Sequence, residues 1–247
     1  MTEREKYQFE LDLPKKMLLR ETKHFRIYYY PASLAEKELV NIAAQREKAY
    51  SDIAAYLSTD IDIIVDLYLF DDAHTKETET NHRGAGWAFD TVMVEIYTED
   101  IKCHPYHELV HVFADTIYGP TLSFFSEGLA VFISESAYNH DFGDYVNYNT
   151  QEKVQQFHQD GELFSLREMF SLQIGERISN PRVSYPQAAS LIKYLYILLG
   201  KNAFFELYQQ LQCDYTDGGI ANNIETFEKR CGILLEQVNQ DWLNTVV

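Results

Sequence analysis

The chain has 247 residues, 46% of them hydrophobic and 14% aromatic, a composition typical of a globular protein with room for a sizeable core. Its 38 acidic residues outnumber its 21 basic residues and give a formal net charge of −17, which argues against nucleic acid or an anionic membrane as a partner. No apolar run reaches the ~18 residues of a membrane-spanning helix. The N-terminus is charged and lacks the apolar core of a signal peptide. We therefore expect a cytoplasmic protein, or a secreted one if a leader was trimmed.

The first third of the chain alternates between strand and helix patterns. Residues 1–21 are polar and predict an irregular N-terminal arm. Residues 24–30 (HFRIYYY) are rich in β-formers and predict a strand. Ser33 and Glu36 then form a capping box that opens a helix, whose apolar residues recur at helical spacing as far as Leu57. Residues 61–70 alternate between apolar and polar side chains and predict a second strand.

A polar loop is predicted over residues 71–83, with its two histidines, His74 and His82, exposed to solvent. The sequence GAGWAF follows at residues 84–89, and residues 91–97 predict another strand. The glycines have two interpretations. They form a turn that leads into a hairpin, or they let a second backbone approach an edge strand closely.

The next helix carries the sequence HELVH at residues 107–111. Residues four apart lie on the same helix face, so His107 and His111 can direct ring nitrogens at one atom, as tetrahedral zinc requires. Glu108 leans over the same face and can take a proton from a metal-bound water. The other positions are apolar nearly all round, which indicates a buried helix rather than a chance match on the surface. His104 precedes this helix and is expected to be a polar residue at its start, not a ligand.

A third ligand is required, because catalytic zinc has three protein ligands and a water. Glu127 supplies one in the sequence SEGLA, where its neighbours are apolar. A buried carboxylate without a partner is costly, and a cation removes that cost. Gly119 and Pro120 end the first helix, and Thr121 or Ser123 is expected to cap the second. The sequence therefore predicts Zn²⁺ held by two histidines and Glu127.

The C-terminal half is mostly helical. His140 and His158 are interpreted as surface residues, and residues 165–170 predict a turn onto a short helix. Ser184 and Gln187 predict a capping box that opens a helix over residues 187–199. Helices over 201–212, 223–230 and 233–245 follow, separated by Gly200, by the pair Gly218 and Gly219, and by Gly232. The three cysteines, Cys103, Cys213 and Cys231, are scattered and do not indicate a disulfide framework.

HELVH followed by FSEGLAVF resembles the gluzincin zinc metallopeptidases, in particular their peptidase-MA-like branch, which has H-E-x-x-H and then E-G-x-A. In these enzymes the two histidines and the later glutamate hold zinc, and the glutamate of the first motif is the general base. The resemblance thus implies zinc ligands at His107, His111 and Glu127 and the catalytic base at Glu108. One position departs from the pattern. Val131 stands where some gluzincins carry an Asp that orients a zinc-bound histidine, so that role needs another carboxylate, with Asp115 as a candidate.

The resemblance extends to SYPQAAS at residues 184–190, which in the family opens a helix that lines the cleft. It implies that Tyr185 hydrogen-bonds the developing oxyanion, whereas the alternative is a Tyr that caps a core helix. It also places an edge strand that pairs with extended substrate backbone near Gly86–Phe89.

We therefore expect an α+β gluzincin fold. A single catalytic domain over residues 22–247 would combine a lobe with a mixed sheet, about 22–120, and a helical lobe, about 121–247, with the cleft between them. The predicted activity is zinc-dependent hydrolysis of peptide bonds in a peptide or protein substrate by a water that Glu108 activates. Two alternatives stay open: a catalytically silent zinc-holding protein that binds peptides or a protein partner through the cleft, and a metal-free scaffold with a vestigial motif. Nothing in the sequence specifies an oligomeric state.

Overall fold

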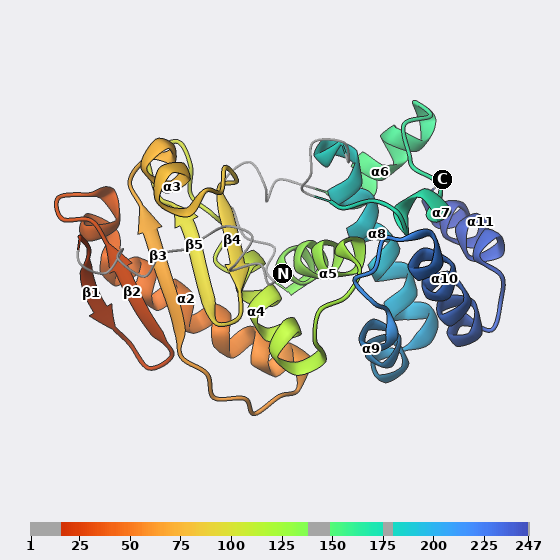
Figure 1. Ribbon diagram of the computed structural model, residues 1–247, viewed down its shortest axis with the longest axis horizontal. Coiled ribbons are helices and arrows are strands. Elements are labelled where there is room, and N and C mark those ends of the chain that lie inside the picture. Colours follow the sequence, from red (N-terminus) through yellow and green to blue (C-terminus); the bar gives the residue numbers. More distant parts are fainter. Residues whose placement is uncertain (1–15, 138–148, 175–179, 247) are drawn as a thin grey trace. The chain divides into compact units, whose positions relative to one another are not determined.

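The structure, a computed structural model, describes residues 16–137, 149–174 and 180–246 (Figure 1). The chain separates into two compact units, Met1–Phe113 and Ala114–Val247, and the division falls inside the helix α4 (His107–Tyr118). The first unit contains a mixed sheet and the second is helical in its described part, so the predicted α+β class is confirmed. The grouping of both into one catalytic domain stays a prediction.

The sheet of the first unit has the strand order β1-β2-β3-β5-β4. Its strands are β1 (Leu18–Glu21), β2 (Phe25–Tyr29), β3 (Val65–Phe70), β4 (Gly86–Phe89) and β5 (Val92–Ile96). The β2–β3 and β3–β5 pairs are parallel, and both outer pairs are antiparallel. β4 lies at the edge of the sheet and forms an antiparallel hairpin with β5, so the hairpin and the edge strand are both present, and the approach of a second backbone to that edge stays a prediction.

Two predictions for the first unit are wrong in informative ways. The end of the predicted arm forms β1, whose side chains are all exposed, so the strand has no apolar face for a sequence pattern to show. The predicted loop contains the helix α3 (Ala73–Thr80), capped by Asp72, whose carboxylate accepts the Thr75 N–H at 2.7 Å. Its buried side chains, Lys76 and Thr80, are polar, so no apolar repeat marks it as a helix.

The helix α2 (Leu34–Leu57) crosses between the parallel strands β2 and β3, as predicted. Ser33 caps it by accepting the Glu36 N–H at 3.2 Å, while the Glu36 carboxylate accepts the N–H of Ala32 rather than that of Ser33. Tyr50 of α2 makes edge contacts with Phe25 of β2 and with Phe113 of α4. The first half of α4 is thus held against α2.

The face of the sheet opposite α2 is lined by aromatic side chains. Tyr68, Phe70, Trp87 and Phe89 are buried there with Val94 and Met17. Because side chains alternate along a strand, Gly86 and Ala88 of β4 lie on the other face, together with Glu95 of β5. This alternation brings the glycine of the edge strand to the side on which α4 lies.

The second unit is built from the helices α5 (Ser123–Ala137), α6 (Thr150–Gln159), α7 (Leu166–Met169), α8 (Pro181–Leu199), α9 (Lys201–Gln210), α10 (Asp217–Cys231) and α11 (Leu235–Val246). The short helix predicted over residues 165–170 is confirmed as α7, which Ser165 and Glu168 open with a capping box. The hydroxyl of Ser123, by contrast, does not cap α5 but bonds the backbone of Leu172 and Ile174. None of the three cysteines forms a disulfide. No helix in the described ranges combines the length and apolar character needed to cross a membrane.

The predicted start of α8 is wrong. The helix begins at Pro181, a residue that is favourable in a first turn because the N–H it lacks has no acceptor there. Ser184 and Gln187 therefore lie inside the helix, and the Gln187 amide bonds the backbone of Phe164 instead of capping. Gly218 and Gly219 likewise lie inside α10, which Thr216 caps.

Gly128 lets α5 approach α8 closely. A Cβ atom at this position would lie 2.6 Å from Cγ1 of Ile192 and 2.8 Å from the carbonyl oxygen of Ala188. The backbone oxygen cannot move aside as the end of a side chain can. The packing of α5 on α8 therefore requires glycine at the residue that follows Glu127.

We predict that Gly128→Ala lowers the free energy of unfolding by about 1–3 kcal/mol, the usual cost of overpacking. The measurement is equilibrium denaturation in urea. Gly218→Ala is the matched control: it also lies in a helix, no atom lies within 4 Å of an added Cβ, and the substitution should stabilise by about 0.5–1 kcal/mol. A Gly128→Ala protein as stable as the parent would contradict the close approach.

Candidate metal centre

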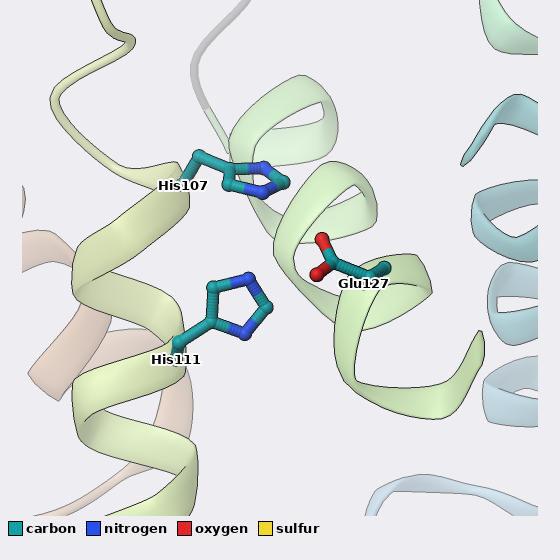
Figure 2. Close-up of side chains that lie close together, drawn as sticks. All are labelled: His107, His111 and Glu127. Carbon is teal, nitrogen blue, oxygen red and sulfur yellow. The ribbon is translucent and has the colours of Figure 1, made fainter. Parts of the chain in front are cut away.

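Three side chains that the sequence predicts as zinc ligands come together. His107 and His111 on α4 and Glu127 on α5 each offer one ligand atom, and these atoms lie within 4.8 Å of one another. Figure 2 shows both imidazoles projecting from one side of α4 and the Glu127 carboxylate extending from α5 towards them. The two ring centroids are 5.0 Å apart, with the rings nearly perpendicular. All three side chains are half-buried.

The helical framework explains this geometry. The histidines are one turn apart, so they share a face of α4. Gly119 ends α4 with a positive φ of 82°, and α5 begins four residues later, so Glu127 lies about one turn into the next helix. Ligand atoms around a tetrahedral zinc at ~2.0–2.1 Å are about 3.3 Å apart. Small side-chain rotations would bring this group to that spacing.

The donor set fits zinc. Two imidazoles and one carboxylate are a known catalytic combination for zinc and leave a fourth position for water or substrate. Calcium and magnesium prefer sites made only of oxygen ligands, which two ring nitrogens do not provide.

Glu108 is 9% exposed, and its carboxylate lies against the edge strand. A Cβ atom at Gly86 would overlap the Glu108 carboxylate, coming within 3.0 Å of Cδ. Only glycine therefore fits at this point of β4 while Glu108 keeps its position. The predicted catalytic base and the predicted substrate strand are in contact.

The pairing of β4 decides which of its backbone groups face outward. The Ala85 carbonyl accepts the Ile96 N–H at 2.8 Å, and Gly86 lies opposite Glu95 in the register. In an antiparallel pair, residues alternate between facing the partner strand and facing away. The N–H and C=O groups of Gly86 and Ala88 therefore point to the free edge of the sheet.

A buried ion pair, which the sequence did not reveal, supports this region. Arg46 of α2 donates two hydrogen bonds to the fully buried carboxylate of Glu95, and its Nη1 donates to the Pro105 carbonyl at 3.2 Å. Burial raises the pKa of Glu95, the guanidinium lowers it, and the nearby Glu108 raises it further. Arg46 thus joins α2, β5 and the segment just before α4. The sequence feature that could have indicated this ion pair is the position of Arg46, which lies on the apolar stripe of α2, four residues after Ile42.

The other candidate residues have separate outcomes. Tyr185 is half-buried in the second turn of α8, and Asp115 is exposed on α4; their roles as oxyanion donor and histidine partner stay predictions. His104 lies three residues before α4 and accepts the Tyr106 N–H at Nδ1, which agrees with the predicted polar residue at the helix start, although its side chain is only 7% exposed.

Four other histidines, His74, His82, His140 and His158, were predicted to be solvated. His74 is exposed and His158 is half-buried on α6, while His140 falls outside the described residues. The prediction is wrong for His82, whose Nδ1 lies 2.9 Å from the buried Nζ of Lys76 and whose ring stacks on Trp87.

Comparison with known proteins identifies the fold. No protein-family model and no curated protein sequence matches the chain. Among solved structures, it is similar to a mutant M1 zinc metallopeptidase from Deinococcus radiodurans bound to a Tyr-Ser-Ala substrate, with a TM-score of 0.51 and 11% identity over 92% of this chain. A two-domain M1 zinc metallopeptidase mutant bound to L-arginine gives a TM-score of 0.50 at the same identity and coverage. The chain spans about half the length of these metallopeptidases, 51% in both cases. At this identity the likeness establishes the fold and leaves the activity open.

We predict that Arg46→Met lowers the free energy of unfolding by about 3–5 kcal/mol, because it leaves the Glu95 carboxylate buried without its partner. Urea denaturation measures the loss. The control is Arg167→Met, which removes an exposed pair with Glu236 and should cost no more than about 1 kcal/mol. Equal effects of the two substitutions would show that the buried pair does not support the unit.

Proposed function

We propose that this chain is a zinc-dependent peptidase that hydrolyses peptide bonds in a peptide or protein substrate. The observation that carries the proposal is the group of His107, His111 and Glu127, with Glu108 buried beside it on the same helix and in contact with an edge strand. A metal-binding triad alone would fit many zinc proteins. A carboxylate next to the triad and a strand edge next to the carboxylate are what peptide hydrolysis needs.

The three ligands would hold zinc, which when bound lowers the pKa of a water and polarises a carbonyl. Glu108 accepts the proton of the attacking water at its carboxylate and returns it to the leaving amine. The outward N–H and C=O groups of Gly86 and Ala88 bond an extended substrate backbone, as when a peptide adds a strand to a sheet. The hydroxyl of Tyr185 donates to the developing oxyanion.

The fold is consistent with this activity. The M1 structures that share it are zinc metallopeptidases, one bound to a Tyr-Ser-Ala substrate and another to L-arginine. The catalytically silent zinc-holding protein remains the rival, since it would retain the triad and the strand edge and lack only turnover.

We predict that the protein, reloaded with zinc after purification, binds about one zinc per chain and cleaves members of a diverse peptide pool. Glu108→Gln should keep the zinc and the fold, because residue 108 is not a ligand, while cleavage falls by about 10²–10⁴-fold. Elemental analysis and mass spectrometry of the digest measure the two effects.

The exposed Glu99→Gln on the same unit is the matched control and should cleave at the parent rate. Absence of stoichiometric zinc would refute the metal site. Stoichiometric zinc without cleavage by the parent would favour the silent peptide-binding protein.

For Tyr185, we predict that Tyr185→Phe lowers kcat by about 10²–10³-fold with little change in KM, because an oxyanion donor acts only as charge develops. The ring and its packing are kept, so zinc content and the unfolding midpoint should stay near those of the parent. Tyr194→Phe, on the same helix and also half-buried, is the control. A Tyr185→Phe protein that cleaves normally, or whose defect follows a loss of stability, would return this residue to a packing role.

A further inference from the structure

Lys76 is a fully buried cation on α3, and its partners form a complete site for an ammonium group. Its Nζ lies 2.9 Å from Nδ1 of His82, and it donates to the carbonyl of His82 at 3.3 Å and to that of Gly84 at 2.8 Å. An ammonium has three protons to donate. All three acceptors come from the short turn at residues 82–84, so this one side chain holds the turn.

This arrangement is costly for a residue with only a packing role. Burial lowers the pKa of Lys76 from 10.5 to about 8, an effect opposed by electrostatic interactions with Cys103, Glu108 and Glu95. An apolar side chain of similar length would avoid the desolvation penalty. What the apolar side chain would lack is the set of hydrogen bonds to the turn.

The turn leads directly into the edge strand. The carbonyl of Gly84 bonds Lys76, that of Ala85 bonds β5, and Gly86 then lies against Glu108. From the other side, the His82 ring stacks on Trp87 of β4 at 5.2 Å. Gly84 has no room for a side chain, because a Cβ there would lie 2.6 Å from Cε1 of His82. The course of the chain over residues 82–86 is therefore fixed.

We propose that Lys76 is a positioning residue, whose Nζ fixes the turn at residues 82–84 and so holds the outward backbone groups of Gly86 and Ala88 beside Glu108. The claim that Lys76 fixes this turn does not depend on whether the protein is a peptidase. Its consequence, that Lys76 sets how a peptide backbone binds along β4, rests on the proposed peptidase function.

The test is Lys76→Met, which keeps the length of the side chain and removes its donors. In the register of β4, the N–H groups of Trp87 and Phe89 face β5, so their hydrogen exchange reports whether the edge strand is held. We expect their exchange to be about 10–100-fold faster in the variant, the equivalent of hydrogen bonds to a charged group. Exchange of the β2 and β3 amides should be unchanged.

Lys16→Met is the matched control, since Lys16 also bonds a residue of α3, Glu79, but is exposed. Unchanged exchange at Trp87 and Phe89 in Lys76→Met would overturn the proposal. So would a uniform increase over the whole sheet, because that is the result expected of a residue needed only for the core.

A pH profile separates the role from simple packing. The groups that face Lys76 are His82 on the turn, Glu95 on β5, Cys103 before α4 and Glu108 on α4. Opening the turn exposes Lys76 and restores its higher pKa, so between pH 8 and 10 the open state binds more protons than the closed state. The closed state then gains stability as pH rises, and the opening constant should fall by up to about tenfold per pH unit. Lys76→Met should show no such dependence, and an identical dependence in both proteins would contradict the role.

The functional half is measured on the peptide that the parent cleaves fastest. Lys76→Met should raise KM about tenfold or more with zinc content and kcat near the parent values, because substrate alignment is lost while the triad is kept. If hydrogen exchange at β4 is faster in Lys76→Met but KM is unchanged, the proposed role of Lys76 in substrate binding is overturned. If the parent cleaves no peptide, the peptidase proposal fails, and the exchange experiment still decides whether Lys76 holds the strand.

Discussion

The ionisable side chains buried in the unit that carries the sheet include Arg46, Lys76, Glu95 and Glu108. Charge removed from water must be paired or it destabilises the fold, so each of these groups determines the position of its partners. Arg46 joins α2 to Glu95 of β5 and to the backbone before α4. Lys76 joins α3 to the turn before β4. The ion pair and hydrogen bonds that offset the cost of burying these charges therefore also determine the positions of α4 and the edge strand.

Close packing makes the arrangement more specific. Gly86 of β4 touches Glu108, and Gly128 on α5, the residue after Glu127, touches the backbone of α8. At both positions a methyl group would displace a neighbour, and in both cases that neighbour is, or directly supports, a residue of the candidate site. Without the first contact, the edge of the sheet would not reach the carboxylate. Without the second, α5 would not pack as closely on α8.

The sequence predicted what depends on neighbours along the chain. Two histidines one turn apart, a glutamate between them and a second glutamate one short connection later are local facts, and the structure brings His107, His111 and Glu127 together. The sequence patterns failed to predict elements that depend on contacts between distant residues or on the burial of polar side chains. The strand β1 exists because β2 pairs with it, and α3 buries Lys76 and Thr80 where a repeat search expects apolar residues. The start of α8 was misplaced because Ser184 and Gln187 match a capping box, yet the Gln187 side chain bonds Phe164, 23 residues away.

This division between local and distant determinants bears on how function is encoded. The candidate metal ligands and the proposed base lie on two consecutive helices, and the chemistry proposed for them follows from residue type and spacing. The groups that would handle a substrate backbone, Gly86 and Ala88, have no chemistry of their own, and their meaning comes from strand order and register. The fold is shared with an M1 zinc metallopeptidase at 11% identity, so the backbone arrangement is similar although most side chains differ. Residues that are near neighbours in the sequence thus supply the candidate metal group, whereas the position of the edge strand depends on long-range contacts such as those of Lys76 with residues 82–84.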